Sequence, residues 1–275
     1  MIFTPRLQRI HAMEGKSVTG LRQSMSSRHR VAWVTGASGG IGLALAHELA
    51  RCGMMVAISS RSREKLEALA TEHPHFHPFP VDVTDEAAMT NTADAIRRDL
   101  GDIDLAVFNA GTHLPVHGSS FTAEPFRALM SVNVMGAVYG LAAVLPRMVA
   151  RRSGQVALMG SLSGYRGLPT AAAYGATKAA INNMAESLRP ELERCGVAVS
   201  VINPGFVRTP LTDRNDFPMP FLVEPDEAAR IIVEGLEARK FEIVFPRRMA
   251  VLMKLARIMP QRLYFMFTRR MVRDR

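Results

Sequence analysis

Short apolar runs alternate with longer amphipathic stretches from Val31 to Phe245. A short apolar run indicates a buried strand, whereas apolar residues that recur every three or four positions indicate a helix. Strands are predicted at Val31–Thr35, Met55–Ser59, Phe76–Val81, Leu105–Asn109, Gln155–Met159, Ala198–Asn203 and Glu242–Phe245, and helices at about 41–52, 62–71, 85–99, 124–149, 174–194 and 226–239. This alternation predicts one α/β domain, a doubly wound parallel sheet with helices on both faces.

Two of the predicted helices begin with capping signals. Asp85 stands just before the third helix, and Asp226 follows Pro225 at the start of the sixth. A carboxylate at such a position accepts a hydrogen bond from a free backbone N–H, and proline rigidifies the entry. We therefore expect Asp85 and Asp226 to cap these two helices.

The chain divides into three parts. Residues 1–29 show no sustained periodicity and are interpreted as a poorly ordered arm, and residues 30–245 carry the alternation of strands and helices and form one domain. Residues 246–275 form a basic amphipathic helical extension, in which Met249–Met259 places Lys254 and Arg257 opposite an apolar face. Apolar faces edged by Lys and Arg are typical of helices in a membrane interface. Two interpretations stay open: peripheral membrane contact, or packing on the active-site rim or a partner subunit.

Composition and charge narrow the functional classes. The net charge of +9 is concentrated at the ends, because residues 1–30 contribute +5 and residues 246–275 contribute +8, so the remainder sums to −4. A nucleic-acid-binding protein spreads basic residues over a folded face, so this distribution argues against one. The two cysteines, Cys52 and Cys195, exclude a disulfide scaffold and suit a reducing, cytoplasmic location.

Three histidines, His73, His75 and His77, alternate with prolines and a phenylalanine. No carboxylate or cysteine at ligand spacing accompanies them, so we expect an exposed loop and no metal site.

The first predicted strand runs into a glycine-rich turn that opens a helix. The turn contains Gly36, Gly40 and Gly42 together with Ser38 and Ile41. Glycines allow the backbone to turn tightly and to approach a pyrophosphate, and the helix start presents free N–H groups to the anion. A glycine turn in this strand-to-helix context predicts a dinucleotide site.

The end of the second strand discriminates between cofactors. A carboxylate there would bind the ribose 2′-hydroxyl of NAD, but the chain has Ser60 and Arg61. A guanidinium suits bidentate contact with a 2′-phosphate, so NADP(H) is favoured over NAD(H), with Ser60 or Ser38 assisting. The alternative is that Arg61 and Arg63 are solvated charges at a helix start.

Acid–base chemistry is predicted at Tyr174 and Lys178. The two are four residues apart in a predicted helix and therefore share a face. A nearby ammonium favours the phenolate, so Lys178 is expected to lower the pKa of Tyr174 toward neutrality. Ser161 follows the fifth strand at the carboxyl edge of the sheet, where it can hold a substrate oxygen.

These motifs, in this order, resemble the short-chain dehydrogenase/reductase family from Val31 to Phe245, whose fold is Rossmann-like. The resemblance also rests on Asn109-Ala110-Gly111 and on Asn203-Pro204-Gly205. It implies that Asn133, Ser161, Tyr174 and Lys178 form a catalytic tetrad, in which Asn133 binds a water that relays protons and Lys178 holds the nicotinamide ribose. It further implies that Asp82 contacts adenine, that Asn109 contacts the adenosine ribose, and that Val207 and Thr209 contact the carboxamide. With the glycine turn and Arg61, the expected cofactor-binding residues are Gly36, Ser38, Gly40, Ile41, Gly42, Ser60, Arg61, Asp82, Asn109, Gly111, Tyr174, Lys178, Pro204, Val207 and Thr209.

Residues 30–245 are therefore expected to be a dinucleotide-binding catalytic domain. The expected function is an NADP(H)-dependent oxidoreductase that interconverts a carbonyl and a secondary alcohol of a small molecule. Large apolar side chains in residues 210–223, Phe217, Met219, Phe221 and Leu222, predict a loop that closes over an apolar or lipid-like substrate or packs on the domain. His113 and His117 are weighed as substrate contacts against a solvated loop. Alternatives are a 3-oxoacyl-thioester reductase, a non-catalytic nucleotide-binding protein and a membrane-surface protein. The resemblance implies a homodimer or homotetramer assembled through residues 124–149 and 174–194.

Overall fold

The computed structural model describes residues 30–213 and 218–272. The proposed arm at residues 1–29, Phe217 of the substrate loop and the last three residues lie outside this part. The strands are β1 (Val31–Thr35), β2 (Met55–Ser59), β3 (Phe76–Pro78), β4 (Leu105–Phe108), β5 (Gly154–Met159), β6 (Val197–Pro204) and β7 (Glu242–Phe245). The α-helices are α2 (Gly40–Arg51), α3 (Arg63–Glu72), α4 (Glu86–Leu100), α5 (Glu124–Leu129), α6 (Gly136–Ala150), α7 (Ala172–Arg194), α8 (Pro225–Glu237), α9 (Arg247–Ile258) and α10 (Gln261–Arg269).

All seven strands are parallel and form one sheet in the order β3-β2-β1-β4-β5-β6-β7. The order reverses beside β1, which places a crevice for ligands at the carboxyl ends of β1 and β4. The predicted doubly wound α/β fold is confirmed.

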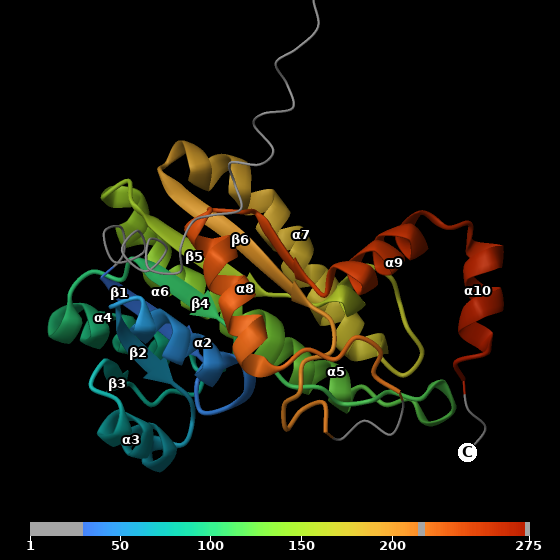
Figure 1. Ribbon diagram of the computed structural model, residues 1–275, viewed down its shortest axis with the longest axis horizontal. Coiled ribbons are helices and arrows are strands. Elements are labelled where there is room, and N and C mark those ends of the chain that lie inside the picture. Colours follow the sequence, from blue (N-terminus) through green and yellow to red (C-terminus); the bar gives the residue numbers. More distant parts are fainter. Residues whose placement is uncertain (1–29, 214–217, 273–275) are drawn as a thin grey trace, which may run out of the picture.

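The alternation of side chains along β1 explains how both faces of the sheet are covered. Ala32 and Val34 pack into a core shared with α2 and α8, whereas Val31 and Trp33 pack into a core shared with α4, α6 and α7. Successive side chains of a strand point to opposite faces, so two helical layers sandwich the sheet (Figure 1).

The third strand is shorter than predicted. It ends at Pro78 rather than Val81. Pro78 and Pro80 have no N–H to donate to a neighbouring strand, and only the N–H groups of Phe79 and Val81 continue to reach Ile58 and Ser60 of the adjacent segment.

The helix predicted at 124–149 is interrupted. A π-helical segment, Met130–Met135, separates α5 from α6. Each turn of a π-helix holds more residues than an α-helical turn, and such segments frequently occur at functional sites. Asn133 lies within it and is buried.

This interrupted helix, Glu124–Ala150, is long and apolar enough to cross a membrane. It instead packs against α4, β4 and β5, and Leu141, Val144 and Met148 are buried in the core. The buried face of this helix is therefore part of the domain core.

One of the two predicted caps is wrong. The Asp85 carboxylate accepts a hydrogen bond from the Ala88 N–H at 2.9 Å, as predicted for α4. At α8, however, Glu224 occupies the capping position and makes no side-chain cap bond. Pro225 already lies in the helix, so Asp226 falls in the first turn, where its charge still suits the helix dipole.

Candidate active site

The glycine turn between β1 and α2 is closely packed. Gly36 and Gly40 have positive φ angles of 68° and 55°, which favour glycine. A Cβ on Gly42 would lie 2.3 Å from the Gly36 carbonyl oxygen and 2.5 Å from Asn109 Nδ2. The helix start beyond the turn has no side-chain cap, so its N–H groups remain free for an anion.

Asn109, at the end of β4, braces this turn. Its Nδ2 donates to the carbonyl oxygens of Thr35, at 2.9 Å, and Gly36, at 3.2 Å. The backbone N–H groups of Asn109 and Ala110 both donate to Thr35 Oγ1 at 3.1 Å. Asn109 thus joins β1 and β4 at the crevice, while its contact with a ribose stays a prediction.

The end of β2 brings three predicted cofactor residues near one another. Ser60 Oγ is buried and has no hydrogen-bond partner within residues 30–213 and 218–272. Arg61 is exposed and forms no ion pair with this part of the chain. Hydrogen bonds from Thr84 are the largest cause that lowers the pKa of Asp82, and the charge of Arg61 adds to them.

Asn133 and Lys178 meet beside Gly111. Asn133 Oδ1 accepts from the Thr112 N–H at 2.8 Å, and its Nδ2 donates to the Thr112 carbonyl at 3.0 Å and to Thr177 Oγ1 at 3.1 Å. A Cβ on Gly111 would lie 3.3 Å from Asn133 Oδ1 and 3.6 Å from Lys178 Nζ. The π-helical segment therefore directs the Asn133 amide toward the end of β4 and toward α7.

Ser161 and Tyr174 complete the group. Ser161 follows β5; its Oγ accepts from the Ser163 N–H at 3.1 Å and contacts the Pro204 carbonyl at 3.5 Å. Tyr174 lies in the first turn of α7, where a hydrogen bond joins it to Ser161 and the Lys178 Nζ lies 5.5 Å from its ring centroid. The structure thus brings Asn133, Ser161, Tyr174 and Lys178 together at the carboxyl edge of the sheet.

The expected lowering of the Tyr174 pKa is not observed. Burial raises the pKa of Tyr174, and only the hydrogen bond to Ser161 opposes this. Lys178 does not reverse this effect: its Nζ donates to the Met159 carbonyl at 2.7 Å, and burial lowers its own pKa to about 8. A buried ammonium is costly, which is why the pKa of Lys178 falls.

One histidine joins the site. His113 meets the Tyr174 ring edge-on, with 5.0 Å between ring centroids, and burial lowers its pKa. The sequence alone gave no reason to prefer His113 or His117 as a substrate contact. The fold places the ring of His113 against Tyr174.

The segment after β6 closes the site from the other side. A Cβ on Gly40 would lie 3.2 Å from Thr209 Cγ2, which places this segment beside the glycine turn. Val207 is buried and pairs with Val223, which ties the two ends of the substrate loop together. Of the loop's apolar side chains, Phe221 is exposed, whereas Met219 and Leu222 are half-buried.

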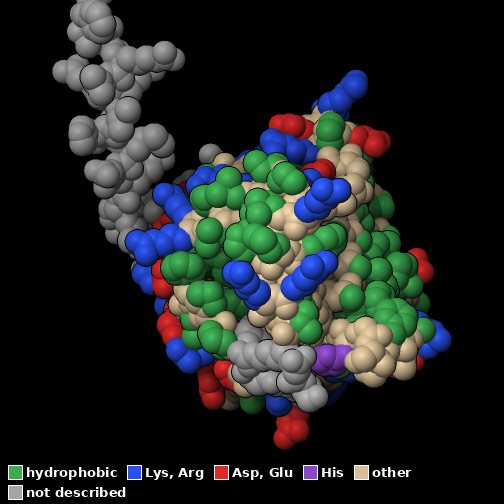
Figure 2. All heavy atoms as spheres, turned by 90° about the vertical axis from the view of Figure 1, so that its right-hand side faces the viewer, with side chains coloured by type: hydrophobic (Ala, Val, Ile, Leu, Met, Phe, Trp, Pro, Cys, Tyr) green, Lys and Arg blue, Asp and Glu red, His purple; other side chains and the backbone are tan. Residues whose placement is uncertain are grey.

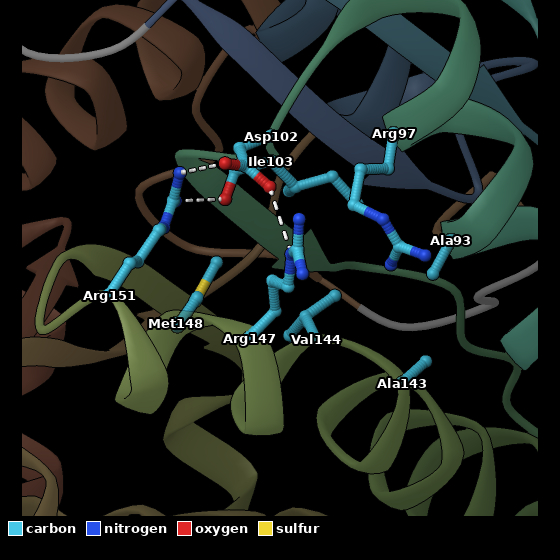
Figure 3. A pocket seen from close by; sticks show the side chains of 9 residues that line it. All are labelled: Ala93, Arg97, Asp102, Ile103, Ala143, Val144, Arg147, Met148 and Arg151. Carbon is cyan, nitrogen blue, oxygen red and sulfur yellow. Dashed lines mark hydrogen bonds and ion pairs between the residues drawn. The ribbon is translucent and has the colours of Figure 1, made fainter.

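Two other features lie apart from this edge. A hollow of about 20 Å³, room for roughly one water molecule, lies where Asp102 pairs with Arg147 and Arg151, near the amino-terminal ends of β4 and β5 (Figure 3). His73 stacks on Phe76 at the start of β3. Neither feature approaches Tyr174.

Comparison with known proteins places the chain among dehydrogenases. The family model described as short chain dehydrogenase matches residues 30–217. An uncharacterized oxidoreductase of Myxococcus xanthus is 39% identical over 247 residues, which cover 88% of this chain and 98% of that protein. An uncharacterized oxidoreductase of Staphylococcus epidermidis is 34% identical over 210 residues, which cover 76% of this chain and 91% of that protein.

Solved structures agree on the fold. A short-chain dehydrogenase from Streptomyces avermitilis superposes with a TM-score of 0.75 at 25% identity and covers 88% of this chain and 97% of its own. A short-chain dehydrogenase/reductase from Burkholderia phymatum, solved in complex with NAD, has a TM-score of 0.76 at 23% identity and covers 83% of this chain and 93% of its own.

Proposed function

The chain belongs to the short-chain dehydrogenase/reductase family of oxidoreductase enzymes, and from that premise we propose that it uses NADP(H) to interconvert a carbonyl and a secondary alcohol. The observation that carries this proposal is the convergence of Ser161, Tyr174, Lys178 and Asn133 beside the glycine turn. The substrate is a small molecule, and we propose that it is apolar or lipid-like.

The residues present fit a dinucleotide. The turn at Gly36 and Gly42 is a bare backbone cradle that a Cβ would fill, and Ser60 Oγ is a buried hydroxyl without a partner in the described chain. The residues that would hold the cofactor are Gly36, Ser38, Gly40, Ile41 and Gly42 at the pyrophosphate, Ser60, Arg61, Asp82, Asn109 and Gly111 on the adenosine side, and Tyr174, Lys178, Pro204, Val207 and Thr209 on the nicotinamide side. When bound, NADP(H) supplies or accepts the hydride.

The protein's own residues manage the proton and the substrate oxygen. Ser161 Oγ, fixed by the Ser163 N–H, holds the substrate oxygen beside the Tyr174 hydroxyl. Burial raises the pKa of the Tyr174 phenol and so favours its protonated form, which acts as the acid in the reduction direction. Lys178 and a water held at Asn133 then return a proton to the phenol.

The choice of NADP(H) depends on the end of β2. No carboxylate stands there to bind a ribose 2′-hydroxyl, and Arg61 is exposed beside Ser60 without an ion pair in the described chain. A planar guanidinium matches a 2′-phosphate in a bidentate manner. NAD(H) is the less favoured cofactor.

Fluorescence titration with NADPH and NADH tests the cofactor. In Arg61→Ala, loss of a charge-assisted hydrogen bond is expected to weaken NADPH binding about 10- to 100-fold, with little change for NADH. Arg63→Ala is the matched control, because Arg63 is exposed nearby but pairs with Glu67 at 3.4 Å. An equal loss of NADPH affinity in both variants would argue against a specific role for Arg61. If the wild type bound neither nucleotide, the proposed reaction would be overturned.

Turnover tests Tyr174 separately. Tyr174→Phe removes the proton donor but keeps the ring that packs against Val116, Leu129 and Ala173. We expect a loss in kcat of about 10²- to 10⁴-fold, whereas NADPH still binds, because the pyrophosphate and adenosine contacts do not involve Tyr174. Activity within threefold of the wild type would exclude Tyr174 as the acid.

Medium-chain aldehydes and ketones form the first substrate panel. Phe221, exposed on the loop after β6, and the half-buried Met219 and Leu222 favour apolar compounds. 3-Oxoacyl thioesters belong in the same panel, because the basic helices α9 and α10 would complement an acidic carrier. Preference for short polar carbonyls would refute the apolar assignment.

The proposal includes assembly and location. We propose a cytoplasmic homodimer or homotetramer formed through residues 124–149 and 174–194, where Met130 and Met135 of the π-helical segment are exposed. Light scattering coupled to size-exclusion chromatography tests this, and a monomer at micromolar concentration would contradict it.

A further inference from the structure

Helices α9 and α10 lie together at one end of the molecule (Figure 1). They carry most of the large apolar side chains that the described chain exposes. We call residues 247–272 the basic apolar surface. Its exposed apolar side chains are Val251, Leu252, Leu255, Ile258, Leu263, Phe265, Met266, Phe267, Met271 and Val272. Such a concentration exceeds the scattered single apolar residues of an ordinary protein surface and indicates a contact with another apolar phase.

The two helices bury little against the domain. Only Ala250 and Met253 of α9 and Tyr264 and Thr268 of α10 are buried. These pairs are three and four residues apart, so each helix touches the domain along one narrow stripe. The rest of each helix circumference, including Ile258 at 79% exposure, faces outward.

The charge of this surface has one sign. Residues 247–272 contain seven Lys and Arg residues and no Asp or Glu. Within the described chain, only Lys254 of the seven forms an ion pair, with Glu242. Figure 2 shows apolar and basic side chains intermixed across this end of the molecule, with acidic side chains toward its margins.

The positive charge of this surface favours an anionic lipid bilayer over a second copy of the chain as its binding partner. A second copy docked on the same surface about a two-fold axis would set seven cations against seven cations, which is unfavourable. An anionic lipid surface offers both an apolar layer for the exposed side chains and negative charge for the Lys and Arg residues.

Polar contacts fix this surface to residues 161–167, which follow β5 and which we call the Ser161 loop. The Glu242 carboxylate accepts from the Tyr165 hydroxyl and from the Lys254 ammonium. The Tyr264 hydroxyl donates to the Gly167 carbonyl, and Arg166 donates to the Arg257 carbonyl at 2.8 Å. Tyr165, Arg166 and Gly167 follow Ser161 by only a few residues, so the two helices have a defined position relative to the proposed site.

We propose that the basic apolar surface, α9 and α10, docks the enzyme on an anionic lipid bilayer with the Ser161 loop held close to that bilayer. The docking goes beyond the proposed reaction and does not depend on it. Apolar side chains enter the boundary between headgroups and acyl chains, and the Lys and Arg residues remain among the headgroups.

Vesicle flotation of the full-length protein tests the docking. The probes are vesicles of phosphatidylcholine alone and of phosphatidylcholine with 30% phosphatidylglycerol, at low and at high salt. We expect flotation with the anionic vesicles and at least tenfold weaker binding at high salt or on the zwitterionic vesicles.

Three paired substitutions separate the apolar and charged contributions. Leu252→Ser with Ile258→Ser removes two exposed apolar groups and is expected to abolish flotation. Arg248→Gln with Arg262→Gln is expected to weaken binding about fivefold for each charge removed. The matched control, Arg63→Gln with Arg98→Gln, removes two exposed charges of α3 and α4 and is expected to leave flotation unchanged.

NADPH titration of each variant establishes that it is folded and separates this proposal from the proposed reaction. The docking is overturned if wild type that binds NADPH does not float with anionic vesicles, or if it floats equally with both lipids. It is also overturned if the apolar variant floats normally. A change in oligomeric state of that variant without vesicles would assign the surface to a protein–protein contact instead.

Discussion

Replacing Lys178 with methionine removes a buried charge while keeping most of the side-chain length. Lys178 is 3% exposed, and burial lowers its pKa from the usual 10.5 to about 8. Each tenfold change in proton affinity corresponds to about 1.4 kcal/mol, so the charged amine costs the folded state about 3 kcal/mol. The Met159 carbonyl then loses its hydrogen bond, which costs about 1–3 kcal/mol.

The sign of the pH effect follows from proton counting. Below pH 8 the folded and unfolded states both carry the proton, so the wild type bears the full penalty. Between pH 8 and 10.5 only the unfolded state binds the proton, so the stability of the wild type rises with pH. At pH 7 we therefore expect Lys178→Met to be about 0–2 kcal/mol more stable than the wild type, and this difference to shift against the variant by about 2 kcal/mol at pH 9.5.

Urea unfolding at pH 7 and pH 9.5, followed by circular dichroism, measures the difference. Lys65→Met is the control, because Lys65 is an exposed lysine on α3. If the difference between Lys178→Met and the wild type were the same at both pH values, the buried Lys178 charge would not have the cost that its burial implies. NADPH-dependent activity should be lost in the variant at either pH.

Three further perturbations test the local structure. Gly42→Ala places a Cβ 2.3 Å from the Gly36 carbonyl oxygen and should destabilise the fold by about 3 kcal/mol in urea unfolding. Gly39→Ala should not destabilise the fold, because a Cβ there has no atom within 4 Å, and equal effects of the two substitutions would contradict the close packing at Gly42. Asp85→Ala should cost about 1 kcal/mol through the lost cap of α4 in the same assay, and a change below 0.3 kcal/mol would mean that the bond at 2.9 Å contributes little. Glu242→Gln should increase trypsin cleavage within α9 and α10 about threefold or more, because it breaks the link between Lys254 and Tyr165; an unchanged cleavage rate would refute that link.

Local pattern determined the secondary structure because buried strands and amphipathic helices leave short-range signals. The apolar run of β1 and the cap at Asp85 are legible in a few adjacent residues, and the strand-to-helix alternation led directly to the parallel sheet that the structure confirms. The errors arose where neighbours in sequence gave ambiguous information. Pro225 is compatible with either side of a helix boundary, and the helix at 124–149 has no local signal for its π-helical segment.

For the candidate site, the sequence revealed which residue types are present but not which residues contact them. The spacing of Tyr174 and Lys178 places both on one helix face. The glycines of the first turn indicate that backbone segments approach each other closely there. Their partners could not be read in this way. Thr112 and Thr177 bind Asn133 across separations of 21 and 44 residues, and His113 reaches Tyr174 from another element.

The sequence by itself therefore determined the fold class, the family and the residue types at the carboxyl edge of the sheet, because these depend on periodicity and on short motifs. Only the tertiary structure decided their electrostatics and surroundings. Burial lowers the pKa of Lys178, and it raises the pKa of Tyr174, which the spacing of the two residues alone was expected to lower. The surroundings of α9 and α10 were also decided by the tertiary structure. Their amphipathic pattern is compatible with packing or with exposure, and the burial of only a few residues, such as Met253 and Tyr264, shows that the domain covers little of each helix. Burial of a side chain depends on many residues that are distant in the sequence, so no local pattern predicts its desolvation or its contacts.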